Sequence, residues 1–155
     1  MEVILNINGE DKKIEIDPGE MLIDTLRNNG YYGPKRACSS GDCGSCTIIL
    51  DGEAVNSCMI FSASASGKKI ETVEGLGTVS NPHPLQKSFV DEGAVQCGYC
   101  IPGMLMSSKA LLDKNNNPTK EEVKEALSGN LCRCTGYVKQ IDAVMNAAAE
   151  IRGEK

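Results

Sequence analysis

The residues best suited to chemistry in this sequence are its eight cysteines, which fall into two groups of four. The first group begins in the segment RACSSGDCGSC, residues 36–46, where small, polar or glycine residues separate three cysteines. Thiols this close together can form disulfides, bind zinc or bind an iron–sulfur cluster. The rest of the sequence has to distinguish these three possibilities.

Disulfides are the least expected of the three. Eight cysteines among 155 residues is a lower density than that of disulfide-stapled miniproteins. The first residues, MEVILNINGED, carry acidic residues and a turn dipeptide where a signal peptide needs a basic stretch and an apolar run. We therefore expect a soluble, cytoplasmic protein whose reduced thiols bind a metal or take part in redox chemistry.

The first cysteine group has the spacing C-x4-C-x2-C followed by a more distant fourth cysteine. This is the plant-type spacing of a [2Fe-2S] cluster, whereas zinc sites more often use paired short knuckles. A cluster needs a loop that wraps it with backbone N–H groups, and Gly41 and Gly44 allow both a close approach and a positive φ. The predicted ligands are Cys38, Cys43, Cys46 and Cys58.

The second cysteine group forms one C-x2-C pair and one C-x-C pair, each just ahead of a predicted helix. A helix N-terminus presents unpaired N–H groups and the positive end of the dipole, which favours an anionic, thiolate-bound cluster. Zinc fits the same four ligands, so the spacing alone leaves both open. A Rieske-type centre is excluded because it needs two histidines and the chain has one. These cysteines are Cys97, Cys100, Cys132 and Cys134.

Other features argue against substrate chemistry on this chain alone. The single histidine, His83, stands between two prolines without a second histidine, which indicates a structural role. The sequence has no G-x-G-x-x-G loop, P-loop or nucleophile–histidine motif. Its net charge of -5 and scattered basic residues argue against a nucleic-acid partner. No run of apolar residues is long enough to span a membrane.

The residues before position 75 predict a small sheet over one helix. Alternating apolar residues flank Asn8-Gly9 and predict a β-hairpin over 3–16. Helical spacing follows over 21–26. A second hairpin around Asp51-Gly52 covers 47–57, and a last short strand covers 69–73.

The residues after position 75 predict helices only. The run GLGTVSNPHP, residues 75–84, has glycines and prolines without strand periodicity and reads as a linker. Turn and capping signals then mark four helices, which we expect to form a four-helix bundle. They cover about 84–92, 102–112, 119–127 and 137–151. The sequence thus predicts an α+β protein with two domains, residues 1–75 and 76–155.

Three segments together resemble the small iron–sulfur subunit of the molybdenum hydroxylases. They are CSSGDCGSCT (38–47), AVQCGYCIPGM (94–104) and SGNLCRCTGY (128–137). That family includes xanthine dehydrogenase, aldehyde oxidoreductase, nicotinate dehydrogenase and aerobic carbon monoxide dehydrogenase, and the resemblance covers nearly the whole chain. It implies a ferredoxin-like β-grasp domain with one [2Fe-2S] cluster on the first cysteine group. It also implies a helical domain with a second [2Fe-2S] cluster on the second group, in place of zinc.

The resemblance also implies a role in a larger complex. In this family a large subunit oxidises the substrate at a molybdopterin-bound molybdenum. Electrons then pass through the helical-domain cluster and the ferredoxin-like one to FAD, often on a third, medium-sized subunit. Carried over by position, Gln96 and Cys134 would contact the molybdopterin of the partner subunit.

The substrate is not encoded in this chain. We expect a purine such as xanthine or another N-heterocycle, with an aldehyde, carbon monoxide or an aromatic acyl-CoA as alternatives. A stand-alone ferredoxin-like carrier is a second hypothesis, because the same clusters would permit it. Two positions depart from the family pattern: Ala37 stands where relatives usually have glycine, and Ile101 where they usually have serine or threonine.

Overall fold

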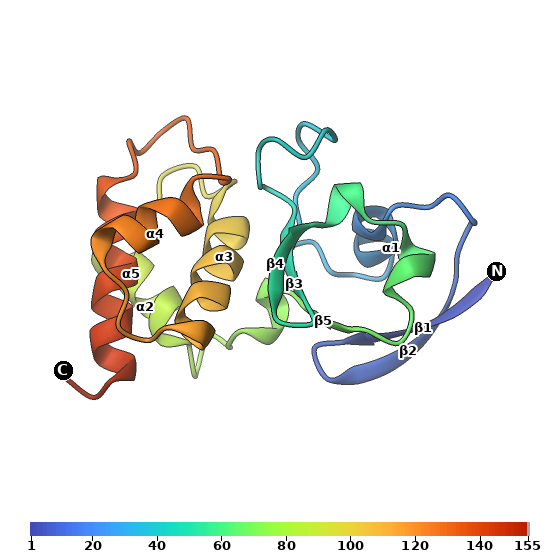
Figure 1. The fold of residues 1–155 in the computed structure, drawn as a ribbon, viewed down its shortest axis with the longest axis horizontal. Coiled ribbons are helices and arrows are strands. Elements are labelled where there is room, and N and C mark those ends of the chain that lie inside the picture. Colours follow the sequence, from blue (N-terminus) through green and yellow to red (C-terminus); the bar gives the residue numbers. More distant parts are fainter. Residues whose placement is uncertain (155) are drawn as a thin grey trace.

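The computed structural model describes residues 1–154 (Figure 1). The chain forms a sheet half, within residues 1–75, and a helical half, within residues 84–151. The two halves lie side by side, and the two chain ends lie at opposite ends of the molecule (Figure 1). No helix within residues 1–154 is long and apolar enough to cross a membrane.

The sheet half contains one five-stranded mixed sheet in the order β2-β1-β5-β3-β4. Its strands are β1 (Glu2–Ile7), β2 (Glu10–Glu15), β3 (Thr47–Leu50), β4 (Glu53–Asn56) and β5 (Lys69–Glu71). Strands β1 and β5 pair in parallel, and the other neighbours are antiparallel. Helix α1 (Leu22–Asn28) packs against one face of this sheet through buried residues such as Leu22 and Leu26.

Both predicted hairpins are confirmed, and their turns explain why they form. Asn8 and Gly9 have φ of 53° and 87°, and Asp51 and Gly52 have φ of 50° and 86°. Two successive positive φ values match the twist of an antiparallel pair, and Asn-Gly and Asp-Gly adopt them at little cost. The predicted strand 69–73 is shorter than expected, because Val73–Gly75 forms a 3-10 turn.

Strand β3 is buried on both faces, which shows how the two halves join. Ile48 belongs to the core that packs on α1. Ile49 points the other way and packs with Met106 and Ala110 of the helical half. In Figure 1, α3 (Ile101–Lys114) lies next to β3 and β4. The helical half therefore covers the β3–β4 end of the sheet face that α1 leaves open, whereas Ile4 of β1 is exposed on that face.

The helical half is the expected bundle of four helices. They are α2 (Pro84–Asp91), α3 (Ile101–Lys114), α4 (Lys120–Leu127) and α5 (Val138–Ile151). Its core contains Phe89, Met104, Val123 and Val144, all nearly inaccessible to solvent. The predicted capping box at Thr119 is present, with its hydroxyl accepting from the Glu122 N–H at 3.2 Å.

Candidate metal centres

The β3–β4 hairpin brings together two cysteines of the first group. Cys46 directly precedes β3, and Cys58 lies in the 3-10 turn Ser57–Met59 that follows β4. The Ser57 hydroxyl donates to the Cys46 carbonyl at 2.7 Å and holds the two strand ends together. Both cysteines are buried. Burial raises the pKa of Cys46 to about 11, and hydrogen bonding between the Cys46 and Cys58 thiols contributes to the shift.

Cys38 and Cys43 form the second pair of this group in the loop before β3. Positive φ values of 84° at Gly41 and 68° at Gly44 curl the loop, as their assignment to a cluster-binding loop requires. Asn56 of β4 donates from Nδ2 to the Gly41 carbonyl at 2.7 Å and ties the loop to the sheet.

The Cys38 thiol is exposed and its acidity is increased by its neighbours. Hydrogen bonds from the Ser40 backbone N–H and side chain, and then from the Cys43 thiol, lower the pKa of Cys38 to about 6. The Ser40 N–H lies 3.5 Å from Cys38 Sγ. The loop therefore stabilises a thiolate at Cys38 without burying it.

The second group also divides into two pairs. Cys100 is the N-cap of α3, and burial followed by a hydrogen bond with the Cys132 thiol raises the pKa of Cys100 to about 12. Cys97 and Cys134 are both exposed, and the hydrogen bond between their thiols raises the pKa of Cys134. Each pair thus joins one cysteine ahead of α3 to one ahead of α5.

The segment that carries Cys132 is held by hydrogen bonds with residues just ahead of α5. The Cys132 N–H donates to the Tyr137 hydroxyl at 2.7 Å, and Cys132 Sγ lies 3.0 Å from Thr135 Oγ1. Burial opposes ionisation of Cys132, but hydrogen bonds from Thr135 and Cys134 outweigh it and lower the Cys132 pKa. Tyr137, predicted inside the last helix, is instead its N-cap with φ of 70°.

The arrangement of the thiols fits a two-iron cluster. Each group provides two pairs of thiols, and the two irons of a [2Fe-2S] cluster take two cysteine ligands each. Thiolate is the ligand that such clusters require, and all eight cysteines are free.

The remaining residues singled out in the sequence lie either on the surface or in contacts within the helical half. Gln96 is exposed beside Cys97. His83 caps α2, with its Nδ1 accepting from the Leu85 N–H at 3.2 Å, as expected for a structural histidine. Ala37 is exposed, and Ile101 packs against the core of the helical half.

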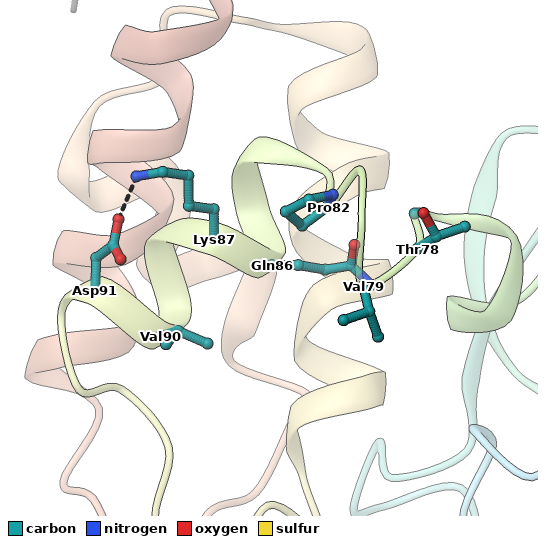
Figure 2. A pocket seen from close by; sticks show the side chains of 8 residues that line it. Thr78, Val79, Pro82, Gln86, Lys87, Val90 and Asp91 are labelled. Atoms are coloured by element: carbon teal, nitrogen blue, oxygen red, sulfur yellow. Dashed lines mark hydrogen bonds and ion pairs between the residues drawn. The ribbon is translucent and has the colours of Figure 1, made fainter.

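A shallow groove of about 390 Å³ lies between the chain before α2 and the outer face of that helix. Val79, Pro82 and Val90 make its lining mainly apolar, and an ion pair of 2.5 Å between Lys87 and Asp91 lies at its edge (Figure 2). None of the eight cysteines lines it. The groove is therefore separate from the candidate metal centres.

Sequence reasoning missed Asn130, which connects the two cysteine groups. Its side chain is buried and bonds to residues of both halves. The only signal in the sequence is its position two residues before Cys132.

Two family models match consecutive parts of the chain. The 2Fe-2S iron-sulfur cluster binding domain matches residues 5–75, and the [2Fe-2S] binding domain matches residues 72–145. The first range contains the first cysteine group and the second range contains the second group. Each half of the molecule thus matches a domain that binds the same type of cluster.

Proteins of similar sequence match over nearly their whole length. The nicotinate dehydrogenase small FeS subunit of Eubacterium barkeri is 48% identical over 147 residues, which cover 94% of this chain and 93% of that protein. The nicotine 6-hydroxylase small subunit of Paenarthrobacter nicotinovorans is 47% identical over 97% of this chain and 92% of that protein.

Solved structures share the fold of the entire chain. Quinoline 2-oxidoreductase from Pseudomonas putida 86 contains a chain with a TM-score of 0.93 and 43% identity, covering 100% of this chain and 98% of that one. The aldehyde oxidoreductase of Desulfovibrio gigas reaches a TM-score of 0.96 at 43% identity, but the match spans 18% of that longer chain. The likeness thus includes both halves and their mutual arrangement.

Proposed function

Because this chain belongs to the family of small iron–sulfur subunits of the molybdenum hydroxylases, or xanthine dehydrogenase family, we propose that it relays electrons within such a complex. It would carry them from a molybdopterin centre on a large partner subunit to FAD on a medium partner subunit. The observation that carries this proposal is that one chain holds two groups of four cysteines, each inside a stretch that matches a [2Fe-2S]-binding domain.

The pairs suggest which residues would hold each iron. In the sheet half, Cys38 with Cys43 and Cys46 with Cys58 would each bind one iron. In the helical half, the corresponding pairs would be Cys97 with Cys134 and Cys100 with Cys132. When bound, a [2Fe-2S] cluster accepts and releases single electrons.

The protein's own contribution is to hold the thiolates and to adjust their surroundings. The Ser40 N–H near Cys38 and the Thr135 hydroxyl near Cys132 are hydrogen-bond donors to sulfur, which help to set a reduction potential. Cys46 and Cys100 are buried thiols with raised pKa values, so iron binding has to displace their protons.

The exposure of the cysteines supports a direction for the relay. Cys97 and Cys134 are exposed, and Gln96 is exposed next to them, so a partner can approach this pair. We propose that Gln96 and Cys134 contact the molybdopterin. Cys38 is exposed in the sheet half and would mark the side that faces the flavin subunit.

The names of the relatives, and not this chain, support a proposal for the substrate class. Nicotinate dehydrogenase, nicotine 6-hydroxylase and quinoline 2-oxidoreductase are named for N-heteroaromatic compounds. We therefore propose hydroxylation of an N-heterocycle. An aldehyde is the alternative, because aldehyde oxidoreductases are also similar to this chain.

The cytoplasmic location of the protein stays a prediction.

The decisive experiment is purification of the native protein without dissociating its partners. We expect it to elute as a heteromeric complex with a molybdopterin-containing chain and a flavin-containing chain. Elution of the native protein as a monomer carrying both clusters would instead establish a stand-alone carrier. Comparison of N-heterocycles and aldehydes as reductants of the purified complex would then decide the substrate class.

A further inference from the structure

The ligand loops of the two halves touch each other directly. The Leu131 N–H donates to the Cys43 carbonyl at 2.9 Å. Leu131 immediately precedes Cys132, so this single hydrogen bond joins a ligand residue of the first group to the neighbour of a ligand in the second. Figure 1 shows the loop before β3 and the loop between α4 and α5 at the same edge of the molecule, at the top of the view.

Asn130 fixes this contact with every polar atom of its side chain. The residue is only 3% exposed. Its Nδ2 donates to the Gly44 carbonyl at 3.0 Å and lies 3.2 Å from Thr47 Oγ1. Its Oδ1 accepts from the Ser107 hydroxyl of α3 at 2.7 Å. One side chain therefore ties the first ligand loop, α3 and the segment before Cys132 together.

The backbones at this contact are too close for intervening side chains. A Cβ at Gly44 would lie 2.2 Å from the Gly129 carbonyl oxygen, and a Cβ at Gly103 would lie 2.3 Å from the Gly44 carbonyl oxygen. Residues 43–47, 103–107 and 129–131 thus form a tightly packed unit, which we name the interloop contact. Its geometry is fixed by backbone packing as well as by Asn130.

Other contacts between the halves lie on the surface or away from the ligands. Lys109 pairs with Glu71 at 3.1 Å, and Lys114 pairs with Glu53 at 2.6 Å. The exposed Tyr99 hydroxyl donates to the Arg36 carbonyl at 2.6 Å. These contacts also hold the halves together. None of them is a buried hydrogen bond to the backbone of a first-group cysteine or of a residue next to such a cysteine.

We propose that Asn130 is a positioning residue for electron transfer between the two clusters, which rests on the proposed relay function. It holds the Leu131–Cys43 hydrogen bond in place, and this bond completes a short bonded path between Cys132 and Cys43. Electronic coupling falls more slowly along bonds and hydrogen bonds than across empty space. With both clusters bound, a single electron would pass from the cluster beside Cys132 to the cluster beside Cys43, and no bond along the path would form or break.

The test compares Asn130→Asp with Asn116→Asp in the intact complex. The first variant is nearly isosteric but replaces the donor to Gly44 with an oxygen, whereas the second makes the same charge change at an exposed site. Three quantities are measured: iron content, hydrogen exchange of the Leu131 amide, and the magnetic interaction between the reduced clusters by electron paramagnetic resonance.

For Asn130→Asp we expect wild-type iron content, a weakened magnetic interaction and Leu131 exchange faster by about tenfold, as for loss of one buried hydrogen bond. Asn116→Asp should match the wild type in all three. A simple structural role would accelerate exchange without altering the magnetic interaction. Wild-type exchange or an unchanged interaction in Asn130→Asp would overturn the proposal.

If Asn130→Asp loses iron, the Ser107→Ala variant tests the proposal instead, because it removes only the hydroxyl that orients the Asn130 amide. This variant should keep its full iron content and show faster Leu131 exchange and a weaker magnetic interaction, each to a smaller extent. The absence of both effects would overturn the proposal. Loss of iron in both variants would also overturn it, since Asn130 would then serve cluster assembly. Failure of the proposed function is separate: it would show in the wild-type protein, which would then elute as a monomer or lack its clusters.

Discussion

Gly103 in α3 lies directly against the backbone of Gly44 in the first ligand loop. A Cβ placed at position 103 would stand 2.3 Å from the Gly44 carbonyl oxygen, a distance that real Cβ contacts essentially never show. The glycine is therefore required by a contact between the two halves and not by the conformation of its own helix. Replacing Gly103 with alanine should therefore change the stability in the opposite direction from the same replacement at an ordinary helical glycine.

Gly103→Ala should destabilise the protein. In an ordinary helix interior, replacing glycine with alanine stabilises by about 0.5–1 kcal/mol. Here the added methyl has to push the loop away, and overpacking of this kind costs about 1–3 kcal/mol. Denaturant unfolding of the variant should show this loss of stability.

The matched control is Gly129→Ala, because a Cβ at position 129 meets nothing within 4 Å. It should unfold at the same denaturant concentration as the wild type. If Gly103→Ala were as stable as the control or more so, the close packing of the loop on α3 would be wrong.

His83 should make stability depend on pH. Burial, then the nearby charge of Lys109, lower the His83 pKa, and Asp113 opposes the shift only in part. The unfolded chain, with a histidine pKa of about 6.5, therefore binds more protons than the folded one. The stabilisation is fully present above that pH and is lost as the pH falls through the folded pKa.

Protonation would also remove the Nδ1 acceptor that caps the Leu85 N–H. His83→Asn keeps a capping side chain that does not titrate, so its unfolding free energy should vary less between pH 7.5 and pH 5.5, about one unit on either side of the histidine pKa. His83→Ala should cost about 1 kcal/mol at neutral pH. Equal pH dependence in the wild type and His83→Asn would contradict this account.

Single ligand substitutions should each remove one cluster and leave the other. Cys46→Ser should abolish the cluster of the sheet half, and Cys100→Ser that of the helical half. Iron should fall from about four to about two per chain in each case, because a [2Fe-2S] cluster carries two irons. Electron paramagnetic resonance should lose a different signal in each variant. Loss of the same signal in both would refute the division into two groups.

Ala37→Gly should leave the iron content unchanged. The Ala37 side chain is exposed ahead of Cys38, so its removal opens no buried cavity. At most the reduction potential of the sheet-half cluster should shift. A drop in iron content of the variant would show that the entry to this loop depends on the alanine.

Local features of this fold could be predicted from the sequence because they depend on neighbouring residues. Asn8-Gly9 and Asp51-Gly52 specify their turns through the φ values that they adopt. Thr119 specifies a helix start because its cap partner is Glu122, three residues away. The cysteine spacing in the same way indicated two groups of ligands.

Features that depend on distant residues could not be predicted. The hydrogen bonds of Asn130 reach Ser107 and Gly44, which are far from it in the sequence. No periodicity or local motif encodes such contacts, so they emerged only from the assembled structure.

The central claim is that each half of this chain holds one [2Fe-2S] cluster on its own four cysteines. The most direct test is iron and acid-labile sulfide analysis of the native protein, combined with electron paramagnetic resonance of the reduced form. The account predicts about four irons and about four sulfides per chain with two distinct cluster signals. A colourless protein that contains zinc, or one that shows a single cluster signal, would contradict it.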